Sequence, residues 1–197
     1  MYVVGLSLIL KPFTEDAVTV LGIYYKIQSF FFIPLMGLQQ VILPIISYNY
    51  GAHLYGRVQE TLRYAIGISC VVMSLGTVVF LVIPEQLVGI FSHTPAILAI
   101  GTKAFQTISY NFIPAGISLI LLMYFQGINQ GTAAIVLTVL RQVVLLVPHA
   151  WLLPFWGLDA IWYTFPITEI IVAATGLFLY FKKPLPIQQA AFKAAAI

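Results

Sequence analysis

The chain has 197 residues, of which 61% are apolar and only 8% charged, against about 25% charged in an average soluble protein. Its net charge of +3 is too small and too scattered to predict binding to nucleic acid. This composition excludes an ordinary soluble domain and indicates a polytopic helical membrane protein, with the lipid bilayer as its surroundings.

The first element in chain order is an apolar segment at residues 1–10, which Lys11 and Pro12 end. Its apolar part would rise about 14 Å as a helix, about half of the roughly 30 Å hydrocarbon core. We therefore interpret this segment as the far end of a spanning helix whose beginning is missing. On that interpretation Met1 is an internal or mis-set start.

Five further apolar spans follow, and together with the partial helix they define one transmembrane domain over residues 1–181. Prolines inside three of the spans predict helix bends at Pro34, Pro114 and Pro166. A polar loop is expected from Asn49 to Arg63, and the basic tail at 182–197 lies outside the fold. The expected spans are 17–46, 64–83, 97–126, 133–153 and 160–181.

The stretch from Phe30 to Ala52 is an apolar helix interrupted by Pro34 and Pro44, and it carries a glutamine pair, Gln39 and Gln40. A buried proline leaves a carbonyl without its usual partner, and adjacent glutamines are costly on a lipid-facing surface. Both are tolerated where neighbouring helices or a water-filled cavity satisfy the polar groups. The stretch indicates a helix that lines a pathway, with ordinary helix-to-helix contact as the alternative.

Enzyme chemistry finds little support in the sequence. His53, His93 and His149 lie in different segments without a second ligand at helical spacing, so we expect no metal site. Cys70 is the only cysteine, and no glycine-rich phosphate loop is present. We therefore predict no catalytic residue, no cofactor and no enzymatic activity.

Several motifs occur in a set order along the chain, beginning with the stretch IPLMGLQQVILPIISYNYGA, which ends in Asn-x-Gly-Ala. This stretch resembles a helix of the multidrug and toxic compound extrusion (MATE) family of transporters. The resemblance extends from about residue 13 to residue 181, and it is closest to the bacterial MepA/DinF-like branch. The later motifs are Pro84-Glu85-x-Leu87, Phe112-Ile113-Pro114, Leu140-Arg141-Gln142 and Pro166-x-x-Glu169.

The resemblance implies an all-α membrane bundle. Such transporters have two six-helix lobes and export cationic or aromatic drugs in exchange for sodium ions or protons. This chain resembles the second, C-terminal lobe with its first helix truncated, so the missing N-terminal lobe would be its partner and the chain would be incomplete alone. Two alternatives stay open: a relative that flips lipid-linked saccharides, and a membrane fragment or subunit that does not transport.

Polar side chains inside the spans are the candidates for a substrate or ion pathway. Met36 and Met123 suit the adaptable apolar lining of such a pathway, although plain helix contact would explain each of these residues too. The candidates are Gln39, Gln40, Tyr110, Asn111, Gln126, Arg141, Gln142 and Glu169.

Arg141 and Glu169 are the most deeply placed charges. Counted inward from opposite sides, they lie about 12 Å and about 14 Å deep, so their levels differ by only about 4 Å in a 30 Å core. An unpaired charge there would cost at least about 2.5 kcal/mol. We therefore predict an ion pair or a shared polar partner, either as a fixed salt bridge or as a pair that opens for a proton or a cationic substrate.

Basic residues gather on one side of the predicted topology. Because such residues mark the cytoplasmic face, the loop after Asn49 and the C-terminus are expected inside the cell. The expected location is the inner or plasma membrane of a bacterium or archaeon. The basic residues on that side are Arg57, Arg63, Lys182, Lys183 and Lys193.

Overall fold

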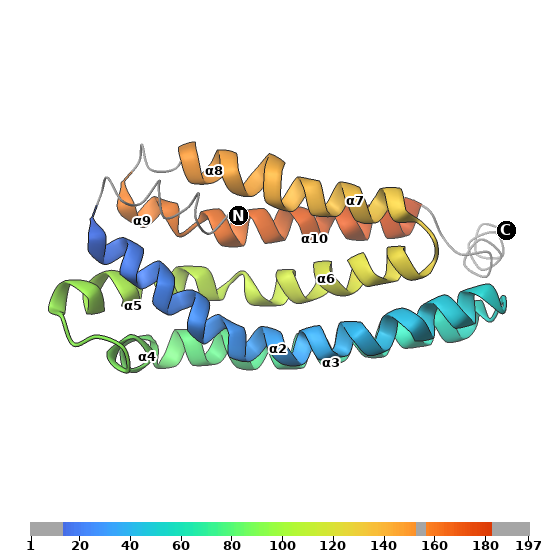
Figure 1. The fold of residues 1–197 in the computed structure, drawn as a ribbon, viewed down its shortest axis with the longest axis horizontal. Coiled ribbons are helices and arrows are strands. Elements are labelled where there is room, and N and C mark those ends of the chain that lie inside the picture. The colour runs from blue at the N-terminus through green and yellow to red at the C-terminus, as the bar shows by residue number, and fades with distance from the viewer. Residues whose placement is uncertain (1–13, 153–156, 183–197) are drawn as a thin grey trace, which may run out of the picture.

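The computed structural model describes residues 14–152 and 157–182, and every element within those ranges is a helix (Figure 1). The expected partial helix at 1–10 and the tail beyond Lys182 lie outside the described residues. The elements are α2 Glu15–Gly51, α3 Tyr55–Val82, α4 Pro84–Gly89, α5 Pro95–Ser109, α6 Phe112–Gly127, α7 Gly131–Val139, the π-helix η1 Leu140–Leu146, α8 Val147–Leu152, α9 Leu158–Ile161 and α10 Thr164–Lys182.

The helix lengths support the predicted all-α membrane fold. Three helical stretches are long and apolar enough to cross a membrane: α2, α3 and the stretch Asp159–Lys182 that contains α10. The pair of α5 and α6 forms a fourth if it is counted as one span with a bend of 47°. The predicted fold class is confirmed, because the described chain consists of helices with several apolar spans.

The 37-residue helix α2 is the longest element. Thr14 caps its first turn by accepting a hydrogen bond from the Ala17 N–H at 3.1 Å. Glu15 and Asp16 lie in the same turn, where their negative charges interact favourably with the positive end of the helix dipole. The helix continues without interruption through Pro34 and Pro44. Figure 1 shows that α2 runs obliquely at its beginning and alongside α3 further on.

The prediction of a polar loop from Asn49 to Arg63 is wrong. Helix α2 continues to Gly51 and α3 begins at Tyr55, so the connection is short. His53 takes a left-handed conformation with φ of 57°, and the Leu54 N–H donates to the Asn49 carbonyl at 2.8 Å. A helix satisfies its backbone internally and can project beyond the bilayer, so polar residues here mark the membrane boundary rather than the helix end.

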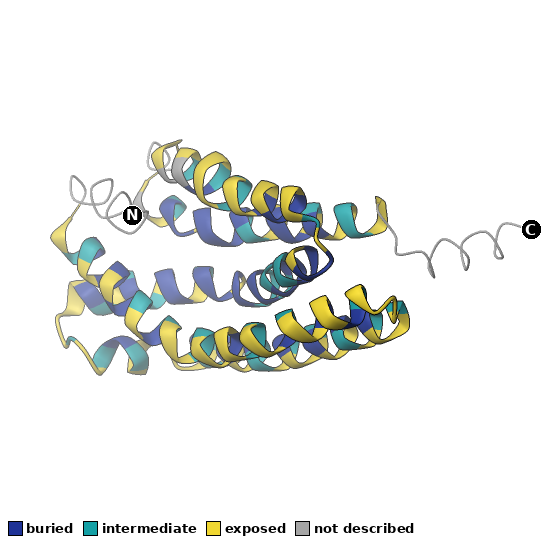
Figure 2. Ribbon diagram, turned by 45° about the vertical axis from the view of Figure 1, so that its right-hand side comes forward, coloured by how far each residue is buried: buried dark blue, intermediate teal, exposed yellow. Residues whose placement is uncertain are grey.

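Helix α6 lies between two layers, with α2 and α3 on one side and α7 and α10 on the other (Figure 1). Burial follows this arrangement, since the buried residues in Figure 2 gather on the facing sides of the helices. Rings from α3, α5 and α6 meet in the core: Phe80 lies 4.8 Å from Phe105 and 4.9 Å from Phe112 between ring centroids. This aromatic cluster fixes the α5–α6 bend against α3.

The bend itself lies at Tyr110 and Asn111, between α5 and α6. Pro114 is the third residue of α6 and has no N–H to donate to the Tyr110 carbonyl four residues earlier. Thr77 of α3 contacts the break, because its hydroxyl lies 3.2 Å from the Ser109 carbonyl as well as 3.0 Å from the Met73 carbonyl of its own helix, and its one proton can go to either oxygen. The polar side chain of Asn111 is thereby placed at the middle of the bundle.

A second break separates α9 from α10. Trp162 and Tyr163 lie between the two helices, and Pro166 is the third residue of α10. Its position relative to the break matches that of Pro114, and it cannot donate to the Trp162 carbonyl. Glu169 therefore projects from the first turns of a helix that starts inside the expected span.

Candidate functional site

A cavity of about 550 Å³ lies between α2, the break before α6, the π-helix η1 and α10. Asn111, Arg141, Gln142 and Glu169, four of the predicted pathway residues, line it together. The structure therefore brings together polar groups from the middle of three predicted spans.

One wall of the cavity is a stripe along α2. Its members Tyr24, Gln28, Phe32 and Met36 are four residues apart, so they share one face of the helix. Met36 was predicted to line a pathway, whereas the three residues before it were not. The stripe gives this wall three apolar side chains or rings and one amide.

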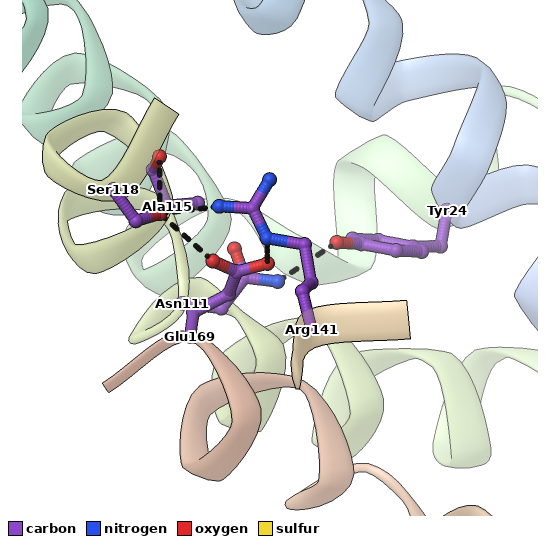
Figure 3. A network of polar contacts seen from close by, with 6 residues as sticks. All are labelled: Tyr24, Asn111, Ala115, Ser118, Arg141 and Glu169. Carbon is purple, nitrogen blue, oxygen red and sulfur yellow. Dashed lines mark hydrogen bonds and ion pairs between the residues drawn. The ribbon is translucent and has the colours of Figure 1, made fainter. Parts of the chain in front are cut away.

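The opposite wall carries the predicted ion pair, which the structure confirms. Arg141 Nε lies 3.2 Å from Glu169 Oε1, and the two side chains are only 18% and 15% exposed. The two charges belong to η1 and α10, as Figure 3 shows. Their pairing avoids the cost of an isolated charge at membrane depth.

Ser118 of α6 completes this group (Figure 3). Its hydroxyl accepts a hydrogen bond from Arg141 Nη2 and lies 3.1 Å from Glu169 Oε2 and 3.0 Å from the Ala115 carbonyl. A hydroxyl has one proton, so it can donate to only one of these two oxygens at a time. Ser118 therefore links the arginine and the carboxylate to the backbone of α6.

Asn111 and Tyr24 connect the helix break to α2. Asn111 Nδ2 donates to Tyr24 Oη at 3.1 Å, and both side chains are buried. The Tyr24 ring lies edge-on to Phe165 of α10, with 5.4 Å between ring centroids. Because its ring and hydroxyl are both held, Tyr24 forms a rigid part of the cavity wall.

The π-helix explains why Arg141, Gln142 and Leu146 all face the cavity. In an α-helix, residues five apart such as Arg141 and Leu146 would lie about 140° apart around the axis. A π-helix bonds each residue to the one five positions away and brings that pair onto one face. Short π-helical stretches occur frequently at functional sites.

The other predicted pathway residues lie elsewhere. Gln39 is half-buried, while Gln40 and Tyr110 are exposed, and none of the three lines the cavity. Gln126 borders a separate groove of about 300 Å³ with Ala134 and Thr138. The polarity of these four side chains did not indicate whether they face the cavity.

Sequence reasoning missed Tyr24, Tyr25, Gln28 and Ser118. Tyr24 and Gln28 were visible as part of the four-residue repeat along α2, which continues to Met36. Ser118 carried no signal, because a serine within a membrane helix usually bonds to its own backbone. Within residues 14–152 and 157–182, no group of three or more His, Cys, Asp or Glu could hold a metal ion.

Known proteins resemble this chain in sequence. The profile of the MatE family matches residues 2–152. The Multidrug export protein MepA of Staphylococcus saprophyticus is 24% identical over 176 residues, covering 89% of this chain and 39% of that protein. The MepA of Staphylococcus haemolyticus is 24% identical over 183 residues, with 92% and 40% covered. The chain thus spans about two fifths of the length of these curated relatives.

Solved structures show the same fold. The MATE multidrug transporter DinF-BH, in complex with a small-molecule ligand, superposes with a TM-score of 0.79 and 25% identity, over 89% of this chain and 40% of that one. A point mutant of the Vibrio cholerae MATE transporter VcmN gives a TM-score of 0.85 at 16% identity, with 91% and 41% covered. Each match therefore covers about two fifths of the larger protein.

Proposed function

Because the chain belongs to the MatE family of multi-pass membrane transporters, which are not enzymes, we propose that it forms part of a cation-coupled antiporter. The exported substrates would be drugs or other organic cations, and the coupling ion sodium or a proton. The chain would be incomplete alone and would work with a second lobe.

The cavity with its ion pair is the observation that carries this proposal. Its volume of about 550 Å³ falls within the roughly 300–1,000 Å³ of small-molecule sites. Aromatic rings and Met36 supply the adaptable apolar lining that suits varied substrates. The Arg141–Glu169 pair borders this cavity rather than a sealed interface, so a cation or a proton can reach it.

The charges of the cavity do not favour a flippase for lipid-linked saccharides. Such a protein needs free cationic groups to hold a diphosphate. Among the described lining residues the one cation is Arg141, which is paired with Glu169. Lys26 lies instead over the Phe91 ring, 5.6 Å from its centroid.

Ethidium efflux from drug-sensitive bacterial cells tests the proposal. The chain expressed alone should give no efflux above an empty vector, because a pathway between two lobes needs both. Co-expressed with the first lobe of a MepA relative, it should restore efflux. With both lobes co-expressed, Arg141→Met should abolish that efflux. Lys103→Met, at an ion pair outside the cavity, should leave it unchanged.

Efflux by the chain alone would contradict the proposed need for a second lobe. Absence of efflux in both arrangements, with both lobes present in the membrane, would contradict the export role. Collapsing the sodium gradient or the proton gradient separately would identify the coupling ion.

The proposed orientation has its own test. With Cys70 replaced, a single cysteine at His53 should resist an impermeant thiol reagent added to intact cells. A cysteine at Asp159 should react with it, because the loop after α2 is cytoplasmic in this proposal and the α9 end is outside. The reverse pattern would overturn the orientation.

A further inference from the structure

We infer that the cavity prefers zwitterionic aromatic ligands, in which a carboxylate accompanies a cationic ring system, over aromatic cations that lack the carboxylate. This inference rests on the proposed function and narrows its substrate class. It follows from the unused hydrogen-bonding groups around the Arg141–Glu169 pair and from the net charge of the cavity.

Arg141 has more donors than its described neighbours use. A guanidinium has five N–H groups, of which Nε faces Glu169 Oε1 and one on Nη2 donates to Ser118. The remaining N–H groups have no partner among the described residues, and in Figure 3 the other terminal nitrogen points away from Glu169. Both Glu169 oxygens, by contrast, already have a neighbour. The pair therefore offers donors to a ligand, and these fit a carboxylate.

The charge balance favours the same ligand. Arg141 and Glu169 are the charged residues among those that line the cavity, so its described lining has no net charge. An aromatic cation can enter this cavity, but it finds no unpaired carboxylate among the described lining residues, because Glu169 is already paired with Arg141. A zwitterion keeps the sum at zero, with its carboxylate on the free side of Arg141.

The wall formed by α2 and the helix break suits the cationic end of such a ligand. Gln28 Oε1 and Asn111 Oδ1 are oxygens buried in this wall without a hydrogen-bond partner among the described residues, so their partial negative charges favour a cation nearby. Tyr24, Phe32 and Phe165 also line the cavity with aromatic rings, which attract a delocalised cation. Donors on η1 and acceptors with rings on α2 thus match the two ends of one molecule.

Rhodamine B and its ethyl ester provide a matched pair of probes, because esterification removes the carboxylate and leaves the cationic ring system unchanged. The full chain in lipid nanodiscs would be dialysed to equilibrium against each dye, with empty nanodiscs to subtract partitioning into lipid. Bound dye would be measured after extraction into acidic ethanol. Rhodamine B should bind on the order of tenfold more tightly than the ester, as expected for a charge-assisted hydrogen bond.

Variants assign this preference to the pair. Arg141→Gln combined with Glu169→Gln removes both charges together and leaves neither unpaired, so the two dyes should then bind within about twofold of each other. Arg141→Gln alone frees Glu169 and should reverse the preference toward the ester. Lys103→Gln alters an exposed ion pair outside the cavity and should preserve the wild-type preference.

Equal binding of the two dyes by the wild-type chain, or tighter binding of the ester, would overturn this inference and leave organic-cation export standing. A preference for rhodamine B that survives in the double variant would overturn it too, because Arg141 would not be its source. Binding of neither dye would contradict both this inference and the proposed role of the cavity in export.

Discussion

The two sides of α6 meet their neighbours in different ways. On one side Gly116 lies so close to α3 that an added Cβ would be 2.5 Å from Ser69 Oγ. On the other side Ser118 faces η1 and α10, where the chain leaves a cavity and holds an ion pair. Residues two apart on a helix lie about 200° apart, so one short segment can face a dense interface and a cavity at once.

This contrast separates the contacts of α6 that depend on close packing from those that depend on charge. Glycines let α6 approach α2 and α3 closely, and the contact there depends on volume. Around Ser118 the contact depends instead on charges that satisfy one another next to an open space. Substitutions on the two sides should therefore fail for different reasons, which can be measured.

The largest effect is expected at the ion pair. Arg141→Met leaves Glu169 without its partner and should lower the free energy of unfolding by about 3 kcal/mol, because breaking a buried pair strands a charge. Arg141→Met with Glu169→Met should recover most of that loss, since no charge remains. Unfolding by SDS in mixed micelles measures both.

Lys103→Met is the matched control, because Lys103 and Asp159 form a pair at 3.4 Å whose side chains are 67% and 62% exposed. Its effect should stay below about 1 kcal/mol. If Arg141→Met cost no more than this control, cavity water would already solvate the pair, and the contrast between the two sides of α6 would fail.

A smaller effect is expected on the glycine side. An added Cβ at Gly127 would lie 2.5 Å from Ile46 Cγ2 and 2.9 Å from Ile46 Cβ. Because a β-branched residue in a helix has one preferred rotamer, Ile46 cannot turn away. Gly127→Ala should therefore destabilise the fold by about 2 kcal/mol in the same SDS titration.

Gly67→Ala provides a control for which the expected change in stability has the opposite sign. No atom lies within 4 Å of a Cβ built at Gly67 of α3, so the substitution gains helix propensity without a clash. It should stabilise the chain slightly. A gain in stability at Gly127 as well would show that the α2–α6 contact is looser than the structure has it.

The smallest effect is expected at the helix break. Thr77→Val removes the hydroxyl that the Met73 and Ser109 carbonyls share, and it should cost about 1 kcal/mol because the Ser109 carbonyl at the break loses this donor. Thr175→Val is the comparison, because that hydroxyl bonds only to the Ile171 carbonyl of its own helix among its described contacts. Equal effects of the two substitutions would mean that the break does not need support from α3.

The composition and the order of the motifs were sufficient for the fold class and the family. Arg141 and Glu169 could be paired from sequence because depth along a membrane helix follows from a fixed rise per residue. The end of α2 could not be read in this way, because Asn49 and the residues after it are polar while the backbone remains helical. Polarity indicates the surroundings of a residue, whereas a helix ends where its hydrogen bonds end.

The sequence by itself therefore determined that this chain is an all-helical membrane protein, and which charges share a level in the bilayer. Only the tertiary structure decided which polar groups face one another. Gln40 and Gln142 have the same side chain and both are exposed, yet the second lines the cavity and the first does not. The direction of a side chain around its axis depends on helix type and on neighbouring helices. The π-helix at Arg141 and the break at Asn111 shift that direction in a way that regular helical spacing does not predict.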